Sequence, residues 1–399
     1  MRQDSNAASG GVSVGLLGRA ALIAFGMMSG VANGTLSPIL PQIEHEFGAS
    51  SEYVTVTMAL TILGLGVLIG SPLGGWLADR LGRHKVMVCS GVIYGIAGCS
   101  IMFAGSLEHV ILGRLILGIA LGAMGAAAYA VIGDAWDAAG RNFWSGLVTA
   151  LGTLAGMTLS IVAGLLADTA WRTSFSIYAI GFVAAALALA GIAGGGSSGS
   201  ASHKGPLLGI PLRLMPAILG FGLIAGSIAT GTAAYLPHRM VEVGLMSSSG
   251  RAVAALSGAG AVVIVSIAYG WIRRFVSLDL AFVLAAVGSA IGLSVMAFGP
   301  TPFAVSLGLG IEGLGIGLMI PSLMIYAIEL SDEANRGRVI GVMKGAVFGG
   351  PFLVQFLLDP IRLRSGASPV LAILAASAVV MAIYFLSRWL GRERAFQPA

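Results

Sequence analysis

Glu312 is the residue whose type and position most directly suggest chemistry. It stands about ten residues after the start of an apolar segment at 302–329, which corresponds to roughly 15 Å along a helix. A charged side chain at membrane depth is costly unless it faces a cavity or a partner. We therefore expect Glu312, the one acid predicted near the bilayer centre, to carry a proton. The alternative is a structural glutamate that is hydrogen-bonded to neighbouring helices.

Two cations also fall inside apolar segments. Lys344 lies about two turns into the segment at 337–359, and Arg114 lies in the outer part of the segment at 109–133. Lys344 could bind an anionic group or pair with Glu312. Either long side chain could instead extend to the membrane surface, as cations near helix ends commonly do.

The segments that would position these residues are strongly apolar. Of 399 residues, 57% are hydrophobic and only 10% are charged, against about 25% charged residues in soluble domains. Mean hydropathy is +0.93. About 20 apolar residues span a bilayer as a helix, and the long continuous runs predict helices rather than a membrane barrel. The isoelectric point near 9.5 is interpreted as membrane orientation by basic residues, not as nucleic-acid binding.

Enzyme, metal and disulfide chemistry find little support. Cys89 and Cys99 lie in one apolar segment, too far apart along a helix to bridge. No HExxH, GxSxG, CxxC or P-loop pattern occurs. We therefore predict a protein that is not an enzyme and needs no metal or cofactor. The first 15 residues lack a signal-peptide pattern, so we expect a cytoplasmic tail.

The predicted fold is all-α, with twelve membrane-spanning helices. They are placed at about 17–39, 52–75, 85–106, 109–133, 143–168, 171–194, 213–236, 252–270, 277–298, 302–329, 337–359 and 367–388. A Gly/Ser-rich stretch predicts a flexible cytoplasmic linker at 195–212 between six-helix bundles at 1–194 and 213–399. With the N-terminus inside, 15 basic residues fall on the cytoplasmic side and 5 on the outer side, which agrees with two cytoplasmic termini.

The two bundles resemble copies of one unit. Gly75-Trp76-Leu77 recurs as Gly270-Trp271-Ile272 after 195 residues (270 − 75 = 195). At the same offset Gly118, Gly122 and Asp134 correspond to Gly313, Gly317 and Glu329. Because each copy has six spans, the copies share one orientation and form a parallel repeat about an axis along the membrane normal.

The loop between the second and third spans carries the most specific motif. Gly75–Lys85 reads GWLADRLGRHK, and it resembles the signature loop of the major facilitator superfamily. The twelve helices and the central linker fit that family along nearly the whole chain. Leu40-Pro41 and Trp171-Arg172 look most like bacterial twelve-helix drug/proton antiporters and their metabolite-exporting relatives.

This resemblance implies a cytoplasmic gate. In the family, the acid that matches Asp79 faces the positive N-terminus of helix 11, and the arginine that matches Arg83 pairs with an acid at the foot of helix 4, here Asp134. Gly74 and Gly75 would let another helix approach closely. The predicted gate residues are Gly75, Asp79, Arg80, Gly82, Arg83 and Asp134. The alternative is a tight turn that anchors positive charge on the inside.

The resemblance also implies a central cavity lined by helices 1, 4, 7 and 10. Its candidate substrate contacts are Asn33, Tyr129, Glu312 and Lys344, although Asn33 and Tyr129 could equally serve helix–helix contacts. Arg114 matches an arginine-glycine motif that the family often ties to proton transfer.

Two departures weaken the export signature. The family's antiporters carry a proline late in helix 5, whereas Gly152-x-x-x-Gly156 is followed here by Met157. Many exporters of cationic drugs also carry an acid in helix 1, and none occurs here between Gly15 and Pro41.

We therefore expect a monomeric secondary transporter in a bacterial cytoplasmic (inner) membrane. It would export a small amphipathic drug-like compound or metabolite by alternating access, with the proton gradient as its energy source. Uptake of a small, possibly anionic, metabolite is the alternative, supported by Arg114 and Lys344. A transport-inactive receptor is a further alternative, but it would need large soluble segments where this chain has short loops.

Overall fold

The computed structural model of the protein describes residues 14–48, 55–192, 215–330 and 336–395. These ranges hold twelve long helices, one short helix and three short 3-10 helices. They are α1 (Leu16–Gly34), η1 (Ser37–Ile39), α2 (Leu40–Phe47), α3 (Met58–Leu81), α4 (Arg83–Ser100), η2 (Ile101–Phe103), α5 (Leu107–Ala135), α6 (Ala138–Thr169), η3 (Trp171–Ala179), α7 (Ile180–Gly191), α8 (Met215–Glu242), α9 (Ser248–Ile272), α10 (Leu278–Phe298), α11 (Pro302–Glu329), α12 (Arg336–Ser365) and α13 (Ala367–Ala395).

The expected all-α membrane fold is confirmed. Eleven stretches of the described helices are long and apolar enough to cross a membrane, and α6 contributes a shorter apolar stretch, Leu154–Thr169. Two helices run well past their predicted ends: α13 continues to Ala395 rather than ending near residue 388, and α12 continues to Ser365 rather than ending near residue 359, with Pro360 inside the helix. At the other extreme, the predicted first span divides, because α1 stops at Gly34 and the chain restarts as η1 and α2, each with a proline in its first turn.

The described chain forms two compact units that differ from a simple cut at the linker. The first unit holds residues 1–35, 62–163 and 172–204, and the second holds 36–61, 164–171 and 205–399. Two short segments from the first half of the sequence therefore belong to the second unit. The predicted division at 1–194 and 213–399 stays a prediction, and the linker at 195–212 lies outside the described residues.

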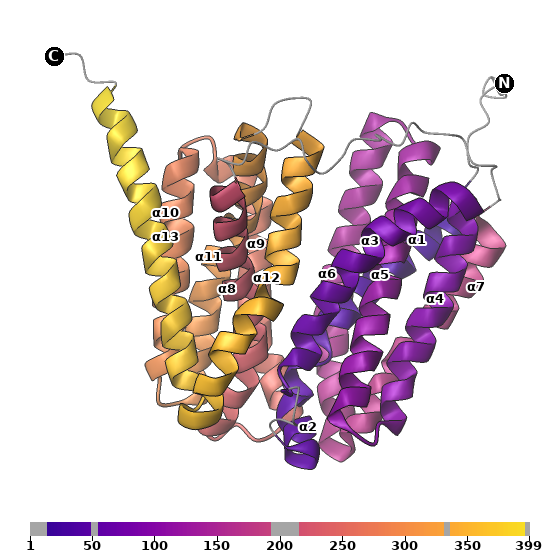
Figure 1. The fold of residues 1–399 in the computed structure, drawn as a ribbon, viewed down its shortest axis with the longest axis horizontal. Coiled ribbons are helices and arrows are strands. Elements are labelled where there is room, and N and C mark those ends of the chain that lie inside the picture. Colours follow the sequence, from indigo (N-terminus) through magenta and orange to yellow (C-terminus); the bar gives the residue numbers. More distant parts are fainter. Residues whose placement is uncertain (1–13, 49–54, 193–214, 331–335, 396–399) are drawn as a thin grey trace. The chain divides into compact units, whose positions relative to one another are not determined.

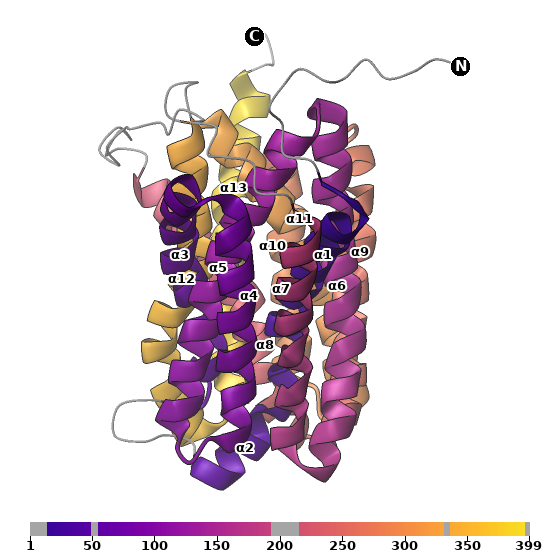
Figure 2. The ribbon, with the colours of Figure 1, turned by 90° about the vertical axis from the view of Figure 1, so that its right-hand side faces the viewer.

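Glycines set the helix spacing in the first unit. A Cβ on Gly30 of α1 would overlap the carbonyl oxygen of Gly152 in α6, and Gly34 and Gly156 meet in the same way. Small residues permit such close backbone approach within membranes. Figures 1 and 2 show α4, α5 and α7 running alongside this pair.

The second unit is built around α8 and α10. Helix α10 packs on α11 and α13, while α8 packs on α12 and α13. Aromatic rings fill one part of this core, where Phe282 stacks on Phe385 with centroids 4.1 Å apart. Helix α12 bends along its length in Figure 1, as expected because the internal Pro351 lacks the N–H that a straight helix needs.

The repeat is visible in the helix contacts of each unit. A Cβ on Gly118 of α5 would overlap the carbonyl oxygen of Leu63 in α3, and a Cβ on Gly313 of α11 would overlap that of Gly258 in α9. Both members of the second pair follow the first by 195 residues (313 − 118 = 195; 258 − 63 = 195). The same helix crossing has therefore been built twice.

Candidate functional site

Glu312 lies buried in the middle of α11, with 2% of its surface exposed. Its Oε1 is 3.0 Å from the Thr232 hydroxyl of α8, which is its hydrogen-bond partner in the part of the chain that the structure describes. That hydroxyl also lies 2.8 Å from the Ile228 carbonyl oxygen. Since a threonine hydroxyl has a single proton, a proton on Glu312 would let both contacts be full hydrogen bonds.

Arg114 is turned into the first unit and is fully buried. Its Nη2 donates to the Ala32 carbonyl of α1 at 2.8 Å, and its Nη1 donates to the Tyr178 hydroxyl at 2.9 Å. Tyr178 in turn lies 2.7 Å from the Thr35 hydroxyl. Of the two alternatives for Arg114, extension to the membrane surface does not hold, because its guanidinium is held by groups on α1 and η3.

The loop between α3 and α4 brings two of the predicted gate residues together. Arg83 forms an ion pair with Asp134 at the end of α5 and donates to the Ala130 carbonyl at 3.1 Å. Gly82 has φ +92°, a left-handed conformation that favours glycine. Arg80 lies over the Trp76 ring, 4.2 Å from its centroid.

The predictions for the two glycines and for Asp79 in this loop have different outcomes. The close helix approach occurs at Gly74, where a Cβ would overlap Ala123, whereas a Cβ on Gly75 would meet nothing within 4 Å among the described atoms. Asp79 lies in α3, but its side chain is outside what the structure describes, so its contact with a helix N-terminus stays a prediction.

Of the other predicted substrate-cavity residues, the structure describes the side chain of one and not those of two. Tyr129 of α5 is 46% exposed and meets Phe25 of α1 edge to face. Asn33 and Lys344 lie in α1 and α12, and their side chains are outside the described set. A pairing of Lys344 with Glu312 therefore stays a prediction.

Sequence reasoning missed a buried carboxylate in the second unit, Asp359 of α12, which is 1% exposed. Its Oδ2 accepts from Gln355 Nε2 at 2.8 Å, from Thr57 Oγ1 at 2.5 Å and from the Thr55 hydroxyl. Its Oδ1 accepts from the Tyr235 hydroxyl of α8 at 3.0 Å. Four donors thus converge on one acid, two of them from the 36–61 segment.

Glu44 of α2 provides a second link within this unit. Its carboxylate pairs with Arg362 of α12 at 3.0 Å and with His238 Nδ1 of α8 at 2.8 Å. Arg362 and His238 are 6% and 8% exposed. Because breaking a shielded ion pair costs more than breaking one in water, this cluster ties α2 firmly to α8 and α12.

A third link uses the end of α6 and the start of α9. The Asp168 carboxylate accepts from the backbone N–H groups of Ser248 and Ser249, at 2.7 and 3.3 Å, and so caps the N-terminus of α9. Arg251, 3% exposed, donates from Nε to the Pro38 carbonyl at 2.9 Å. Segments 36–61 and 164–171 are therefore docked on α8, α9 and α12 by polar contacts.

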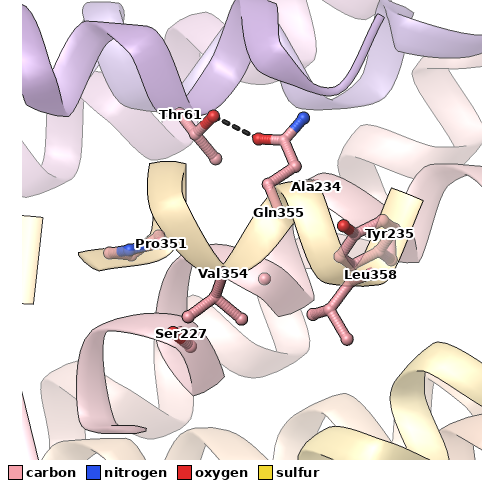
Figure 3. A pocket seen from close by; sticks show the side chains of 9 residues that line it. Thr61, Ser227, Ala234, Tyr235, Pro351, Val354, Gln355 and Leu358 are labelled. Atoms are coloured by element: carbon pink, nitrogen blue, oxygen red, sulfur yellow. Dashed lines mark hydrogen bonds between the residues drawn. The ribbon is translucent and has the colours of Figure 1, made fainter. Parts of the chain in front are cut away.

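A small cavity lies beside the Asp359 network, where α3, α8 and α12 meet. Figure 3 shows Gln355 directed toward Thr61 across it, with Ser227, Tyr235 and Pro351 around the same space. Every lining residue belongs to the second unit. In the described part of the chain no group of three His, Cys, Asp or Glu residues could hold a metal ion.

A sequence signal for the missed residues exists but is weak. Glu44, Asp359 and Arg362 are charges near the ends of predicted spans, where positive and negative residues ordinarily face water. Helix α12 runs past Pro360 and buries Asp359 and Arg362, and their partners lie about 300 residues away in sequence. Pairing over that separation cannot be read from local patterns.

Comparison with known proteins gives a consistent family. A model described as Major Facilitator Superfamily matches residues 22–355. The chain is 29% identical to the arabinose-proton symporter of Escherichia coli over 164 residues, which is 39% of this chain and 33% of that protein. It is 32% identical to the multidrug transporter MdfA of Yersinia pestis over 167 residues, covering 40% and 39% of the two chains. The match thus spans between about a third and two fifths of these relatives.

Solved structures agree on the fold over most of the chain. The nucleoside transporter NupG superposes with a TM-score of 0.75 at 15% identity, covering 94% of this chain and 98% of that one. The inward-open xylose transporter XylE of E. coli gives a TM-score of 0.76 at 14% identity, covering 92% and 95%. At such identities the likeness concerns the fold alone.

Proposed function

This chain belongs to the major facilitator superfamily. We propose that it is a secondary active transporter that exports a small amphipathic drug-like compound or metabolite in exchange for protons. The proposed mechanism is alternating access, in which a central site faces one side of the membrane at a time. The proposed setting is a bacterial inner membrane, with both termini cytoplasmic and the protein acting as a monomer.

The observation that carries the proton coupling is the contact of Glu312. The acid is buried in a predicted span, and the Thr232 hydroxyl that it meets has a second acceptor in the Ile228 carbonyl. A carboxyl that bears a proton satisfies this arrangement, and the proton leaves when the acid meets water. Glu312 is thus suited to bind a proton on one side of the membrane and release it on the other.

Arg114 is proposed to assist from the first unit. Its guanidinium joins α1 to η3 through Ala32 and Tyr178, so a change in its contacts would move helix α1 relative to α5. Arg114 is therefore assigned to proton coupling together with Glu312, while Asn33, Tyr129 and Lys344 remain candidates for the substrate cavity.

Two sets of contacts are proposed as gates at opposite ends. The loop with Arg83 and Asp134 would close the cytoplasmic end, together with Asp79. The contacts of Asp359 and Glu44 would close the outer end, because in the proposed topology the loop after α1 lies outside. Alternating access requires the two gates to open in turn.

Export is preferred over uptake on the sequence resemblance. MdfA is named a multidrug transporter, and the arabinose protein is named a proton symporter. Uptake of a small, possibly anionic, metabolite is the second candidate, which rests on the buried cation Arg114. A transport-inactive receptor is the least supported reading.

Everted membrane vesicles test coupling and direction together. Respiration acidifies the vesicle lumen, which quenches the fluorescence of acridine orange. A compound that the protein exports is added outside the vesicles, enters the lumen in exchange for protons, and so restores the fluorescence. Cationic, anionic and uncharged amphipathic compounds are added in turn. We expect at least one to restore fluorescence with the wild type, and Glu312→Gln to abolish the response.

The matched control is Glu329→Gln, which removes an exposed acid at the end of the same helix. It should respond like the wild type. A response that survives Glu312→Gln would remove Glu312 from the coupling, and a compound that lowers fluorescence further would indicate symport instead of exchange.

A further inference from the structure

The cavity between α3, α8 and α12 has the lining of a binding site. Its polar groups come from Thr61, Ser227, Tyr235 and Gln355, and its apolar wall includes Pro351, Val354 and Leu358. About 10 Å³ of it can hold the centre of a water molecule, close to the space that one water needs. The cavity therefore fits a single hydroxyl-sized group.

The hydrogen-bonding capacity left in the cavity is specific. The Ser227 hydroxyl is buried, with 5% of the residue exposed, and it has no hydrogen-bond partner among the described residues. The Thr61 hydroxyl donates its proton to Gln355, and the Tyr235 hydroxyl donates its proton to Asp359. Both oxygens still have lone pairs, so the cavity offers one unused donor beside several acceptors.

The charge of the lining is equally informative. None of the nine residues that line the cavity is charged. The nearby Asp359 is outside the lining, and its carboxylate already accepts from four donors. A charged ligand group would lose its water without gaining a counter-ion, whereas a hydroxyl both donates and accepts and stays neutral.

We propose that this cavity is a substrate subsite that takes an uncharged hydroxyl group, with Ser227 as its specificity-determining contact. The subsite rests on the proposed transport of an amphipathic compound and narrows that compound to one with an alcohol group.

The position of the subsite connects it with Glu312. Gly231 lines the cavity, and the next residue of α8, Thr232, binds Glu312. One helix therefore carries both the hydroxyl subsite and the partner of the proposed proton carrier. Occupation of the subsite can act on the contact with Glu312 through a shift of α8.

Three probes with one phenylethyl body and different head groups test the subsite: 2-phenylethanol, 2-phenylethylamine and phenylacetate. Binding to the full chain in nanodiscs is measured by isothermal titration calorimetry, with the heat on empty nanodiscs subtracted. The alcohol should bind saturably and more tightly than the amine and the acid. Ser227→Ala should weaken alcohol binding about 2- to 10-fold, the usual range for one neutral hydrogen bond.

Ser289→Ala is the matched control, because Ser289 of α10 is equally buried, has no partner among the described residues and does not line the cavity. It should bind the alcohol like the wild type. Ala234→Val, which fills the cavity from α8, should also reduce binding. Absence of saturable alcohol binding, preference for a charged probe, or an equal loss in both serine variants overturns the subsite.

This experiment is independent of the proton gradient. If exchange fails in everted vesicles while alcohol binding still depends on Ser227, the proposed function fails and the subsite stands. If exchange succeeds while Ser227→Ala binds the alcohol like the wild type, the subsite alone is wrong.

Discussion

Helices α5 and α11 occupy equivalent places in the two copies, yet they carry opposite chemistry. Gly118 of α5 meets the carbonyl of Leu63, and Gly313 of α11 meets that of Gly258, at one constant offset. The buried ionisable residues do not follow this offset. Position 309, the counterpart of Arg114, is leucine, and position 117, the counterpart of Glu312, is also leucine.

The comparison separates what builds the fold from what performs transport. The glycine contacts recur because two backbones can approach closely only where a side chain is missing. The buried charges differ because each needs its own partners, Ala32 and Tyr178 for Arg114 and Thr232 for Glu312. A duplicated scaffold has thus acquired a cation in one copy and an acid in the other.

The largest expected effect comes from the shared scaffold. Gly118→Val and Gly313→Val should each destabilise the protein by about 3 kcal/mol, the upper end of the usual cost of overpacking, because the new side chain overlaps a backbone carbonyl that cannot move freely. Fluorescence-detected size-exclusion chromatography should show loss of the monodisperse peak for both. Gly133→Val, in open space on α5, and Gly310→Val, in ordinary contact on α11, are the controls. A tolerated Gly313→Val would mean that the second copy no longer depends on the crossing.

Helices α6 and α12 are a second pair of equivalent helices that differ in a buried charge. Asp359 of α12 corresponds to Gly164 of α6 at the same offset. Asp359→Leu should open the end of the second unit that it holds, because hydrogen bonds to a charged group contribute about 1.5–3 kcal/mol. Ala59→Cys, at a position buried in the wild type, reports this opening in a background without Cys89 and Cys99. Its labelling by a methanethiosulfonate reagent should accelerate about 10- to 100-fold. An unchanged rate would show that Asp359 does not hold this end closed.

Replacement of Arg114 and replacement of Glu312 should lower the free energy of unfolding by different amounts. Arg114→Leu should lower the free energy of unfolding by about 2 kcal/mol, because it leaves the Tyr178 hydroxyl and the Ala32 carbonyl without their donor. Glu312→Leu should cost about 1 kcal/mol or less, since Thr232 retains the Ile228 carbonyl. Thermal unfolding in one detergent compares them. Equal losses would contradict the assignment of a stronger structural role to the cation.

The smallest effect is expected at the Arg83–Asp134 pair. Its side chains are 15% and 28% exposed, and partly exposed ion pairs contribute about 1 kcal/mol or less. Asp134→Asn should therefore leave the melting temperature nearly unchanged while raising cytoplasmic accessibility of a cysteine in this loop. Glu329→Asn, its counterpart, should change neither quantity, because the position that matches Arg83 is Leu278. Equal responses would mean that both copies contribute a gate.

The helices were predictable because each needs only a local apolar run, and the start of α11 at residue 302 is correct. The burial of Arg114 was not predictable, since an arginine near a helix end can reach water or turn inward, and the choice depends on Tyr178 and the Ala32 carbonyl. The Asp359 network was missed for a related reason. Its donors Thr55 and Thr57 are ordinary residues until the fold brings them to α12.

The polar face of α12 has a consequence for how the protein is made. Its apolar stretch, Gly345–Ser365, has a hydropathy of only 1.3, against 2.4 for the following helix. Gln355 and Asp359 would face lipid with only each other as polar partners if this helix entered the bilayer alone. The residues Thr55 and Thr57, which donate to Asp359 and accept from Gln355, emerge from the ribosome some 300 residues earlier. We therefore expect stable insertion of α12 to follow that of the first-made part of the chain.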